Sequence, residues 1–168
     1  MTPAVSKTPH VRLPLRTADA GDRGAVRAFL HRLSPSTLGA RYLSPLQRVA
    51  EPWGEHELDR LLDRHGGKHM VVLALDGAEV RGIGEYVEES AGQAELALVV
   101  EDKYQGQRVG RVLLRTLEQL ALEHGIRAFT GDVGYGNRRM LGLLRGSGRA
   151  LQVELGYGSL RFSLVLRG

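Results

Sequence analysis

Apolar and polar residues alternate along three consecutive stretches in the middle of the chain, and this alternation predicts three β-strands. The stretches cover residues 69–75, 80–88 and 94–100, and the short segments D-G-A and E-S-A-G-Q separate them. Turns of this length join neighbouring antiparallel strands. We therefore expect a three-stranded β-meander at the centre of the fold.

A pattern of apolar residues with helical spacing follows the meander. Between residues 106 and 124, the apolar residues Val109, Leu113, Leu117 and Leu120 lie on one helical face, and Gly125 is a typical C-cap. Further helices are predicted from a cap at Asp19 or Asp22, from Ser34 to Tyr42, and over residues 55–64 and 136–145. Further strands are predicted over residues 11–15, 128–133, 151–155 and 160–166. This order of elements predicts an α/β fold, with a mixed sheet and helices on both of its faces.

Composition narrows the class of protein. With 168 residues, 42% of them hydrophobic, the chain fits a single domain over residues 11–168, preceded by a flexible tail over residues 1–10. Cysteine is absent, which excludes disulfides, thiolate metal sites and a cysteine nucleophile. No apolar run approaches the roughly 20 residues of a membrane-spanning helix, and the N-terminus lacks the apolar segment that secretion requires. We expect a cytoplasmic protein.

The charge of the chain favours an anionic ligand. The net charge is +4, and most of the basic residues are arginines, which bind phosphate oxygens in a bidentate manner. These arginines are scattered among acidic residues and form no basic run with interleaved aromatics, which argues against a nucleic-acid partner. The six histidines show no metal-ligand spacing, since His65 and His69 fall across Gly66 and Gly67, so no metal site is expected.

The stretch Y-Q-G-Q-R-V-G-R-V-L-L, which begins at Tyr104, places glycines between the third predicted strand and the long predicted helix. The free N–H groups at a helix N-terminus bind phosphate, and glycine lets the ligand approach the backbone. Around such an anion, Gly106 and Gly110 would remove side-chain bulk, and the donors would be Gln105, Gln107, Arg108 and Arg111. The same pattern is also typical of an ordinary turn before a helix. A dinucleotide fold is not expected, because the loop follows an antiparallel meander and not an opening βαβ unit.

Four stretches, in order along the chain, carry a resemblance to a known family. They are L-R-T-A-D-A-G-D, S-P-S-T-L-G-A-R-Y-L, A-E-L-A-L-V-V-E-D-K-Y-Q-G-Q-R-V-G-R-V-L-L and G-Y-G-N-R-R-M-L-G-L-L-R-G-S-G. Together they cover nearly all of residues 11–168, and they resemble the GNAT acyltransferase superfamily. The resemblance implies an N-acetyltransferase that uses acetyl-CoA as cosubstrate. It also implies the GNAT fold, a mixed, mostly antiparallel sheet of about six to seven strands with helices on both faces.

In this superfamily the loop Q/R-x-x-G-x-G/A binds the pyrophosphate of coenzyme A. The resemblance therefore implies cofactor contacts from Gln105, Gly106, Gln107, Arg108, Val109, Gly110 and Arg111. Arg108 departs from the pattern, because it stands where glycine is usual. Two interpretations stay open: the guanidinium pairs with a phosphate, or Arg108 is tolerated and tilts the loop. We favour the first, because the first turn of an α-helix does not itself require glycine.

The resemblance also places the pantetheine arm of the cofactor beside the strand that precedes the loop. It implies contacts with the backbone of Leu98, Val99 and Val100, with the N–H near Leu98 polarising the thioester carbonyl, a task that suits a fixed donor. Asn137 matches an asparagine that contacts the pantetheine arm, although asparagine at this place is equally typical of a helix N-cap. Leu144 occupies the position of the superfamily's general-acid tyrosine, so we expect no general acid from the chain.

Glu95 is the candidate general base. It is predicted to share a strand face with the small apolar residues Ala97 and Val99, and such surroundings favour proton uptake by a carboxylate. The stretches A-E-L-A-L-V-V and N-R-R-M-L-G-L-L are similar to the protein lysine acetyltransferase (Pat-like) branch, in which the glutamate of this strand deprotonates the incoming amine. The alternative is an ordinary carboxylate at a strand edge. Glu85 and Asp132 are lesser candidates that could bind a cationic substrate.

Several functions stay open. The first hypothesis is direct attack of a primary amine on acetyl-CoA in a ternary complex, with a protein lysine side chain as the acceptor that the branch implies. The acceptor could instead be a small amine, such as a polyamine, an amino acid or an aminoglycoside. Because Leu144 and Arg108 depart from the superfamily pattern, the second hypothesis is a module that senses acetyl-CoA without turnover, and a third is a basic domain whose loop binds nothing. The resemblance also allows a homodimer.

Overall fold

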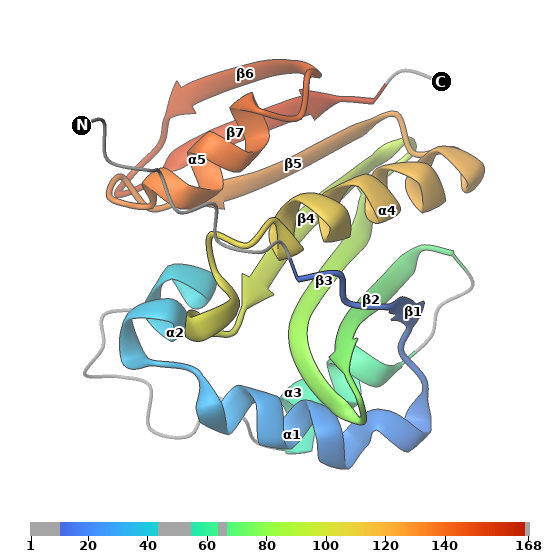
Figure 1. Cartoon of the computed structure of the whole chain (residues 1–168). Coiled ribbons are helices and arrows are strands. Elements are labelled where there is room, and N and C mark those ends of the chain that lie inside the picture. Colours follow the sequence, from blue (N-terminus) through green and yellow to red (C-terminus); the bar gives the residue numbers. More distant parts are fainter. Residues whose placement is uncertain (1–10, 44–54, 64–66, 167–168) are drawn as a thin grey trace, which may run out of the picture.

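A computed structural model describes residues 11–43, 55–63 and 67–166 of the chain (Figure 1). Its strands form a seven-stranded sheet in the order β1-β2-β3-β4-β5-β7-β6. They are β1 Leu15–Thr17, β2 His69–Asp76, β3 Glu79–Ser90, β4 Gln93–Val100, β5 Ala128–Val133, β6 Ala150–Leu155 and β7 Leu160–Val165. β4 and β5 pair in parallel, and the other neighbouring strands pair antiparallel. The predicted mixed, mostly antiparallel sheet and its central meander are confirmed.

Helices cover both faces of this sheet, as the sequence predicted. They are α1 Arg23–Arg32, α2 Pro35–Tyr42, α3 Glu55–Leu62, α4 Val109–Glu123 and α5 Arg138–Arg145, with the 3-10 turns η1 Ala20–Asp22 and η3 Asp102–Tyr104. The larger core contains Leu117 of α4, Leu144 of α5 and Phe129 of β5, so α4 and α5 share one face. The second core contains residues of α1, α3 and the opposite sheet face. None of the described helices combines the length and the apolar composition needed to span a bilayer.

The first strand was predicted wrongly. Residues 11–15 alternate as a strand does, but β1 spans Leu15–Thr17 and pairs with residues 72–74 of β2. Pro14 has no N–H to donate to a ladder, and it only accepts a hydrogen bond from the Leu75 N–H through its carbonyl, at 3.0 Å. The strand therefore begins after the proline.

The start of the long helix was also placed too early. α4 begins at Val109, and residues 105–108 form a turn in which Gly106 and Arg108 have φ angles of 75° and 69°. These left-handed angles interrupt a right-handed helix, so the predicted start at residue 106 is wrong by three positions. The predicted third helix is confirmed over Glu55–Leu62, whereas residue 64 lies outside the described part of the chain.

Candidate functional site

β4 and β5 pair over three residues and then separate. The paired residues are Gln93 with Ala128, Ala94 with Phe129, and Glu95 with Thr130. β4 continues to Val100 and β5 to Val133, and Figure 1 shows the two strands diverging. Within the described residues, the second half of β4 is paired with β3 alone. This leaves a wedge-shaped opening inside the sheet, which we call the β4–β5 opening.

The backbone direction of β4 can be assigned residue by residue. The Glu101 N–H donates to the carbonyl oxygen of Arg81 in β3, at 2.9 Å. Consecutive residues of a strand direct their N–H and C=O groups to opposite sides, so Leu98 and Val100 direct theirs into the opening. The Val100 carbonyl accepts a hydrogen bond from the Gln105 side chain at 2.9 Å, which agrees with this direction.

Val99 differs from its two neighbours. The same alternation directs its backbone groups toward β3, and its side chain is buried in the core beneath α1 and α3. Of the three residues predicted to lie along the pantetheine arm, Leu98 and Val100 therefore present backbone groups to the opening, and Val99 does not.

The loop that follows β4 leads directly into the N-terminus of α4. The first helical hydrogen bond runs from the Val112 N–H to the Arg108 carbonyl at 3.1 Å, so the N–H groups of Val109, Gly110 and Arg111 have no helical acceptor. Arg108 makes no side-chain cap, and the first turn of α4 contains no acidic residue. Exposed arginines at positions 108 and 111 flank these amides. This end of α4 can bind an anion with backbone donors and two guanidinium groups.

Arg108 adopts the backbone conformation that glycine favours. It is the N-cap of α4, with φ 69° and ψ 5°, and is not part of the first helical turn. The argument that a helical first turn tolerates any residue therefore does not apply to it. A residue with a Cβ atom in the left-handed region is strained by about 1–2 kcal/mol. The backbone of the loop thus has the conformation that a glycine would adopt, and the conformational strain lies at Arg108.

The side chains of the loop glutamines form hydrogen bonds with neighbouring parts of the chain. Both N–H donors of the Gln105 amide are used, one to Val100 and one to the Thr37 hydroxyl at 3.1 Å. The Gln107 amide donates to the Lys103 carbonyl at 2.7 Å. These bonds fix the shape of the loop from Val100 to Arg108.

The positions at the start and end of α5 have separate roles. Asn137 is the N-cap, and its side-chain oxygen accepts from the Met140 N–H at 3.1 Å. The N-cap interpretation is thus confirmed, and the amide NH2 of the same side chain stays available for a ligand. Leu144 is fully buried in the core, so a proton donor is absent at this position.

Glu95 lies at the apex of the β4–β5 opening, because it is the last residue of β4 that pairs with β5. It shares a sheet face with Ala97 and Val99, as predicted, but its side chain is exposed. The expectation that apolar neighbours enclose this carboxylate is wrong, because the face of β5 and β7 opposite α5 leaves polar residues such as Arg161 open to solvent. The carboxylate is accessible to both water and substrate.

Glu85 is buried beside the site and is not available to a substrate. Its oxygens contact Arg41, Arg60 at 2.9 Å and His69 at 3.0 Å, and it pairs with Ala97 across β3 and β4. Burial alone would raise the pKa of Glu85, but the hydrogen bonds from His69 and Arg60 and the charge of Arg41 outweigh it and lower the pKa to about 2. Glu85 therefore stays ionised, and it joins α2 and α3 to the sheet.

The carboxylate of Asp132 also forms hydrogen bonds with neighbouring side chains. It accepts from Arg161 at 3.0 Å and from the Ser159 hydroxyl at 3.3 Å. Ser159 belongs to the turn between β6 and β7, so Asp132 holds that hairpin against β5.

A cluster of ion pairs around Glu101 holds the start of the loop between β4 and α4. The sequence patterns did not predict this cluster. The Glu101 side chain is buried and accepts from Arg81 at 2.9 Å and from Arg32 at 3.2 Å. Tyr104 donates its hydroxyl to Asp76 at 2.7 Å. Arg32 and Glu101 are far apart in the sequence, and no local pattern links them.

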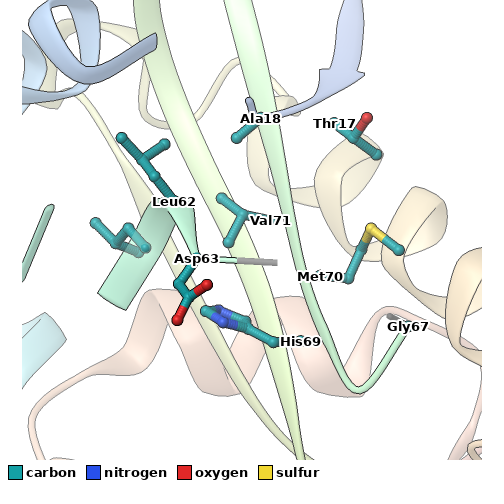
Figure 2. A pocket seen from close by; sticks show the side chains of 9 residues that line it. Thr17, Ala18, Leu62, Asp63, Gly67, His69, Met70 and Val71 are labelled. Atoms are coloured by element: carbon teal, nitrogen blue, oxygen red, sulfur yellow. The ribbon is translucent and has the colours of Figure 1, made fainter. Parts of the chain in front are cut away.

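A separate cavity lies at the other end of the sheet. It has a volume of about 290 Å³ and is lined by residues in or next to β1, β2 and α3, among them Thr17, Leu62 and Val71 (Figure 2). None of the predicted site residues lines it, so we place the candidate site at the β4–β5 opening, where backbone donors converge. Among the described residues, no group of three or more histidine, aspartate or glutamate side chains is arranged to hold a metal ion.

Residues 30–148 match the model of the acetyltransferase (GNAT) family. A curated acetyltransferase of Pseudomonas aeruginosa is 34% identical over 139 residues, which cover 78% of this chain and 70% of the relative.

Solved structures show the same fold. The GNAT domain of S. lividans PAT has a TM-score of 0.81 at 23% identity, over 90% of this chain and 89% of that chain. The PaiA N-acetyltransferase of Thermoplasma acidophilum, solved in complex with coenzyme A, has a TM-score of 0.65 at 16% identity, over 91% and 98% of the two chains.

Proposed function

This chain belongs to the acetyltransferase (GNAT) family, and we propose that it transfers the acetyl group of acetyl-CoA to a protein lysine side chain. Family membership makes it an acetyl-CoA-dependent N-acetyltransferase. The lysine acceptor and the roles of individual residues are our proposal. The observation that carries it is the open edge of β4, with the exposed carboxylate of Glu95 at its apex.

The two halves of the cofactor have complementary sites on the chain. The pantetheine arm lies along β4, with its amides bonded to the backbone groups of Leu98 and to the Val100 N–H, as an additional strand would be. The Val100 carbonyl already accepts from Gln105. The pyrophosphate lies at the N-terminus of α4, bound by the N–H groups of residues 109–111 and by Arg108 and Arg111. The amide of Asn137 donates to the pantetheine arm from the opposite wall.

The chain then provides a donor and a base for the transfer. Acetyl-CoA supplies the acetyl group as a thioester, whose C–S bond breaks as the new C–N bond forms. The Leu98 N–H donates to the carbonyl oxygen as negative charge develops on it. Glu95 takes the proton of the substrate ammonium, directly or through one water, before the nitrogen attacks. The nitrogen loses its second proton to solvent as the amide forms, and solvent protonates the departing thiolate, because Leu144 offers no proton.

A lysine on a protein fits the surroundings of Glu95. Glu95 is exposed. On the same face, β5 and β7 present the polar residues Thr130, Ser163 and Arg161, so a bulky acceptor can reach the carboxylate without crossing an enclosed pocket. The stretch A-E-L-A-L-V-V, which contains Glu95, carries the resemblance to the Pat-like branch. A small amine is the alternative acceptor.

An acceptor panel tests the proposal. Peptides that contain one lysine and a blocked N-terminus are compared with spermidine, kanamycin and free amino acids, while thiol release from acetyl-CoA is followed. The same peptides with an acetylated lysine are the matched controls. We expect the highest kcat/KM with the free-lysine peptides. Faster turnover of a small amine would overturn the lysine acceptor, and binding of acetyl-CoA without thiol release by any acceptor would favour a sensing module.

Cofactor binding itself is tested by thermal unfolding. Coenzyme A at 100 times its dissociation constant should stabilise the folded chain by about 2.7 kcal/mol. A melting temperature that does not respond to coenzyme A would contradict the cofactor site at the loop.

A further inference from the structure

α2 is held in place mainly by polar contacts. It packs against β4, yet none of its residues is buried. At its C-terminal end, Arg41 contacts the buried carboxylate of Glu85, and the Tyr42 hydroxyl donates to Glu57 at 2.9 Å. The apolar contribution of α2 is Leu38, which is partly buried against the second core. A helix with so little buried surface opens locally at low cost, so its position depends strongly on the polar contacts.

Asp102 fixes the other end of α2 to the loop that precedes α4. One carboxylate oxygen accepts from the Ser34 hydroxyl at 2.6 Å and from the Thr37 hydroxyl at 2.9 Å. The other accepts from the Ser34 N–H at 3.1 Å. Ser34 is the N-cap of α2, and Asp102 is the first residue after Glu101, at the start of the loop.

Gln105 adds a second connection between the same two elements. Its amide donates both to Thr37 in the first turn of α2 and to the Val100 carbonyl at the end of β4. The Thr37 hydroxyl is thus shared by Asp102 and Gln105. Burial alone would raise the pKa of Asp102, but the hydrogen bonds from Ser34 and Thr37 outweigh it and lower the pKa, so Asp102 is ionised at neutral pH.

We propose that Asp102 is a positioning residue through which cofactor binding at the loop fixes α2, and with it the Arg41–Glu85 contact beside the acceptor face of β4. The inference rests on the proposed binding of coenzyme A at this loop. Glu85 pairs with Ala97, which lies two residues from Glu95 on the same face, so α2 connects the cofactor loop to the neighbourhood of the proposed base. A ligand that binds the loop in this conformation therefore lowers the fraction of molecules in which α2 is open.

Amide hydrogen exchange tests this connection with coenzyme A as the probe. Titration calorimetry first gives the dissociation constant, and exchange of the α2 amides is then measured with and without saturating coenzyme A. In the wild-type chain we expect coenzyme A to slow this exchange about tenfold, within the usual range of coupling between sites. The quantity to compare is the ratio of the exchange rate without coenzyme A to the rate with it. In Asp102→Ala this ratio should fall below about twofold. The dissociation constant of coenzyme A should change less than about threefold, because the closed form of α2 is the majority state in the wild-type chain and in the variant.

The ratio of the two exchange rates shows whether Asp102 is a positioning residue or has only a structural role. If Asp102 only stabilised α2, exchange in Asp102→Ala would be faster with and without coenzyme A, and the ratio between them would stay that of the wild type. Thr37→Val removes the hydroxyl that Asp102 and Gln105 share, and it should reduce the ratio in the same way. Thr116→Val is the matched control, because the Thr116 hydroxyl bonds only within α4, to the Val112 carbonyl at 3.0 Å.

The outcomes distinguish this inference from the proposed function. Binding of coenzyme A that leaves α2 exchange unchanged in the wild-type chain overturns the inference alone. An undiminished ratio in both Asp102→Ala and Thr37→Val also overturns it. If the wild-type chain does not bind coenzyme A, the proposed function and this inference fall together.

Discussion

Glu95 and Thr130 face each other in the last residue pair that joins β4 to β5. Beyond this pair the two strands separate, so the carboxylate stands where the sheet opens. Its location follows from the register of the parallel pair, and its exposure follows from the open face of β5 and β7. A proton acceptor at this place meets a substrate that approaches the opening from that face.

Replacing Glu95 by glutamine should slow turnover without weakening cofactor binding. The amide keeps the shape of the side chain but cannot take a proton, so kcat should fall by about 10²-fold or more. Steady-state kinetics with the best acceptor and calorimetry with acetyl-CoA measure the two effects. Glu123→Gln at the far end of α4 is the control. Wild-type kcat in Glu95→Gln would remove this residue from the mechanism.

Arg108→Gly should separate the effect of backbone strain on stability from the effect of the arginine charge on cofactor binding. Glycine adopts a φ of 69° without strain, so the folded chain should gain about 1 kcal/mol. Losing a charge-assisted bond to phosphate should at the same time raise the dissociation constant of coenzyme A about tenfold or more. Urea unfolding and calorimetry report on the two properties independently.

Asn also tolerates the left-handed region, so Arg108→Asn tests the loss of charge with a side chain present. Arg127→Ala, beyond the C-terminus of α4, controls for net charge. If Arg108→Gly binds coenzyme A more tightly than the wild-type chain, Arg108 is a steric compromise and makes no phosphate contact.

The contacts of Glu85 with Arg41, Arg60 and His69 should make the free energy of unfolding depend on pH. The pKa of Glu85 is about 2 in the folded chain, against an ordinary value of 4.5, so the unfolded chain binds the proton first. The contribution, about 3 kcal/mol, is complete above pH 4.5 and is lost as the pH falls toward 2. Unfolding by urea at a series of pH values should show this decline.

Glu85→Gln should remove that part of the pH dependence. At neutral pH it leaves the partly buried guanidinium of Arg41 without its counter-charge, which should destabilise the chain by about 3 kcal/mol. A variant that loses as much stability between pH 5 and pH 3 as the wild-type chain would show that another group is responsible.

Gly131 is required where β5 leaves β4. A Cβ atom there would lie 2.7 Å from the Phe162 ring and 3.3 Å from the Leu96 carbonyl oxygen. Phe162 is buried and cannot move aside, so Gly131→Ala should cost about 1–3 kcal/mol. Gly142→Ala should have the opposite sign, because Gly142 is helical with open space around it. Thermal unfolding of the two variants provides the comparison.

The sequence revealed the elements whose patterns are local. The meander, α4 and α5 were predicted because alternation and helical spacing report on burial directly, and the cap at Ser34 was predicted by the residues that follow it. The conformation of Arg108 was missed, because the left-handed region is set by how the loop joins β4 to α4. The contacts of Glu85, Glu101 and Asp102 were missed as well, since their partners come from distant segments.

The β4–β5 opening belongs to this second group. Residues 94–100 read as an ordinary buried strand, and nothing in them indicates that β5 pairs with only the first three residues of β4. The family resemblance placed the pantetheine arm beside this strand, and the register of β4 and β5 showed the opening. Patterns within one strand predict its faces, whereas its edges depend on its neighbours.

Three residue pairs between β4 and β5 are the only direct ladder, in the part of the chain that the structure describes, between a half-sheet of β1 to β4 and a half-sheet of β5, β7 and β6. Next to this ladder the Arg127 N–H donates to the Gly92 carbonyl at 2.7 Å, and side chains from both half-sheets pack beneath α4 and α5. If the two half-sheets rock against each other, the hinge therefore lies at Glu95. A molecule that fills the wedge sets the hinge angle, and with it the direction in which that carboxylate points.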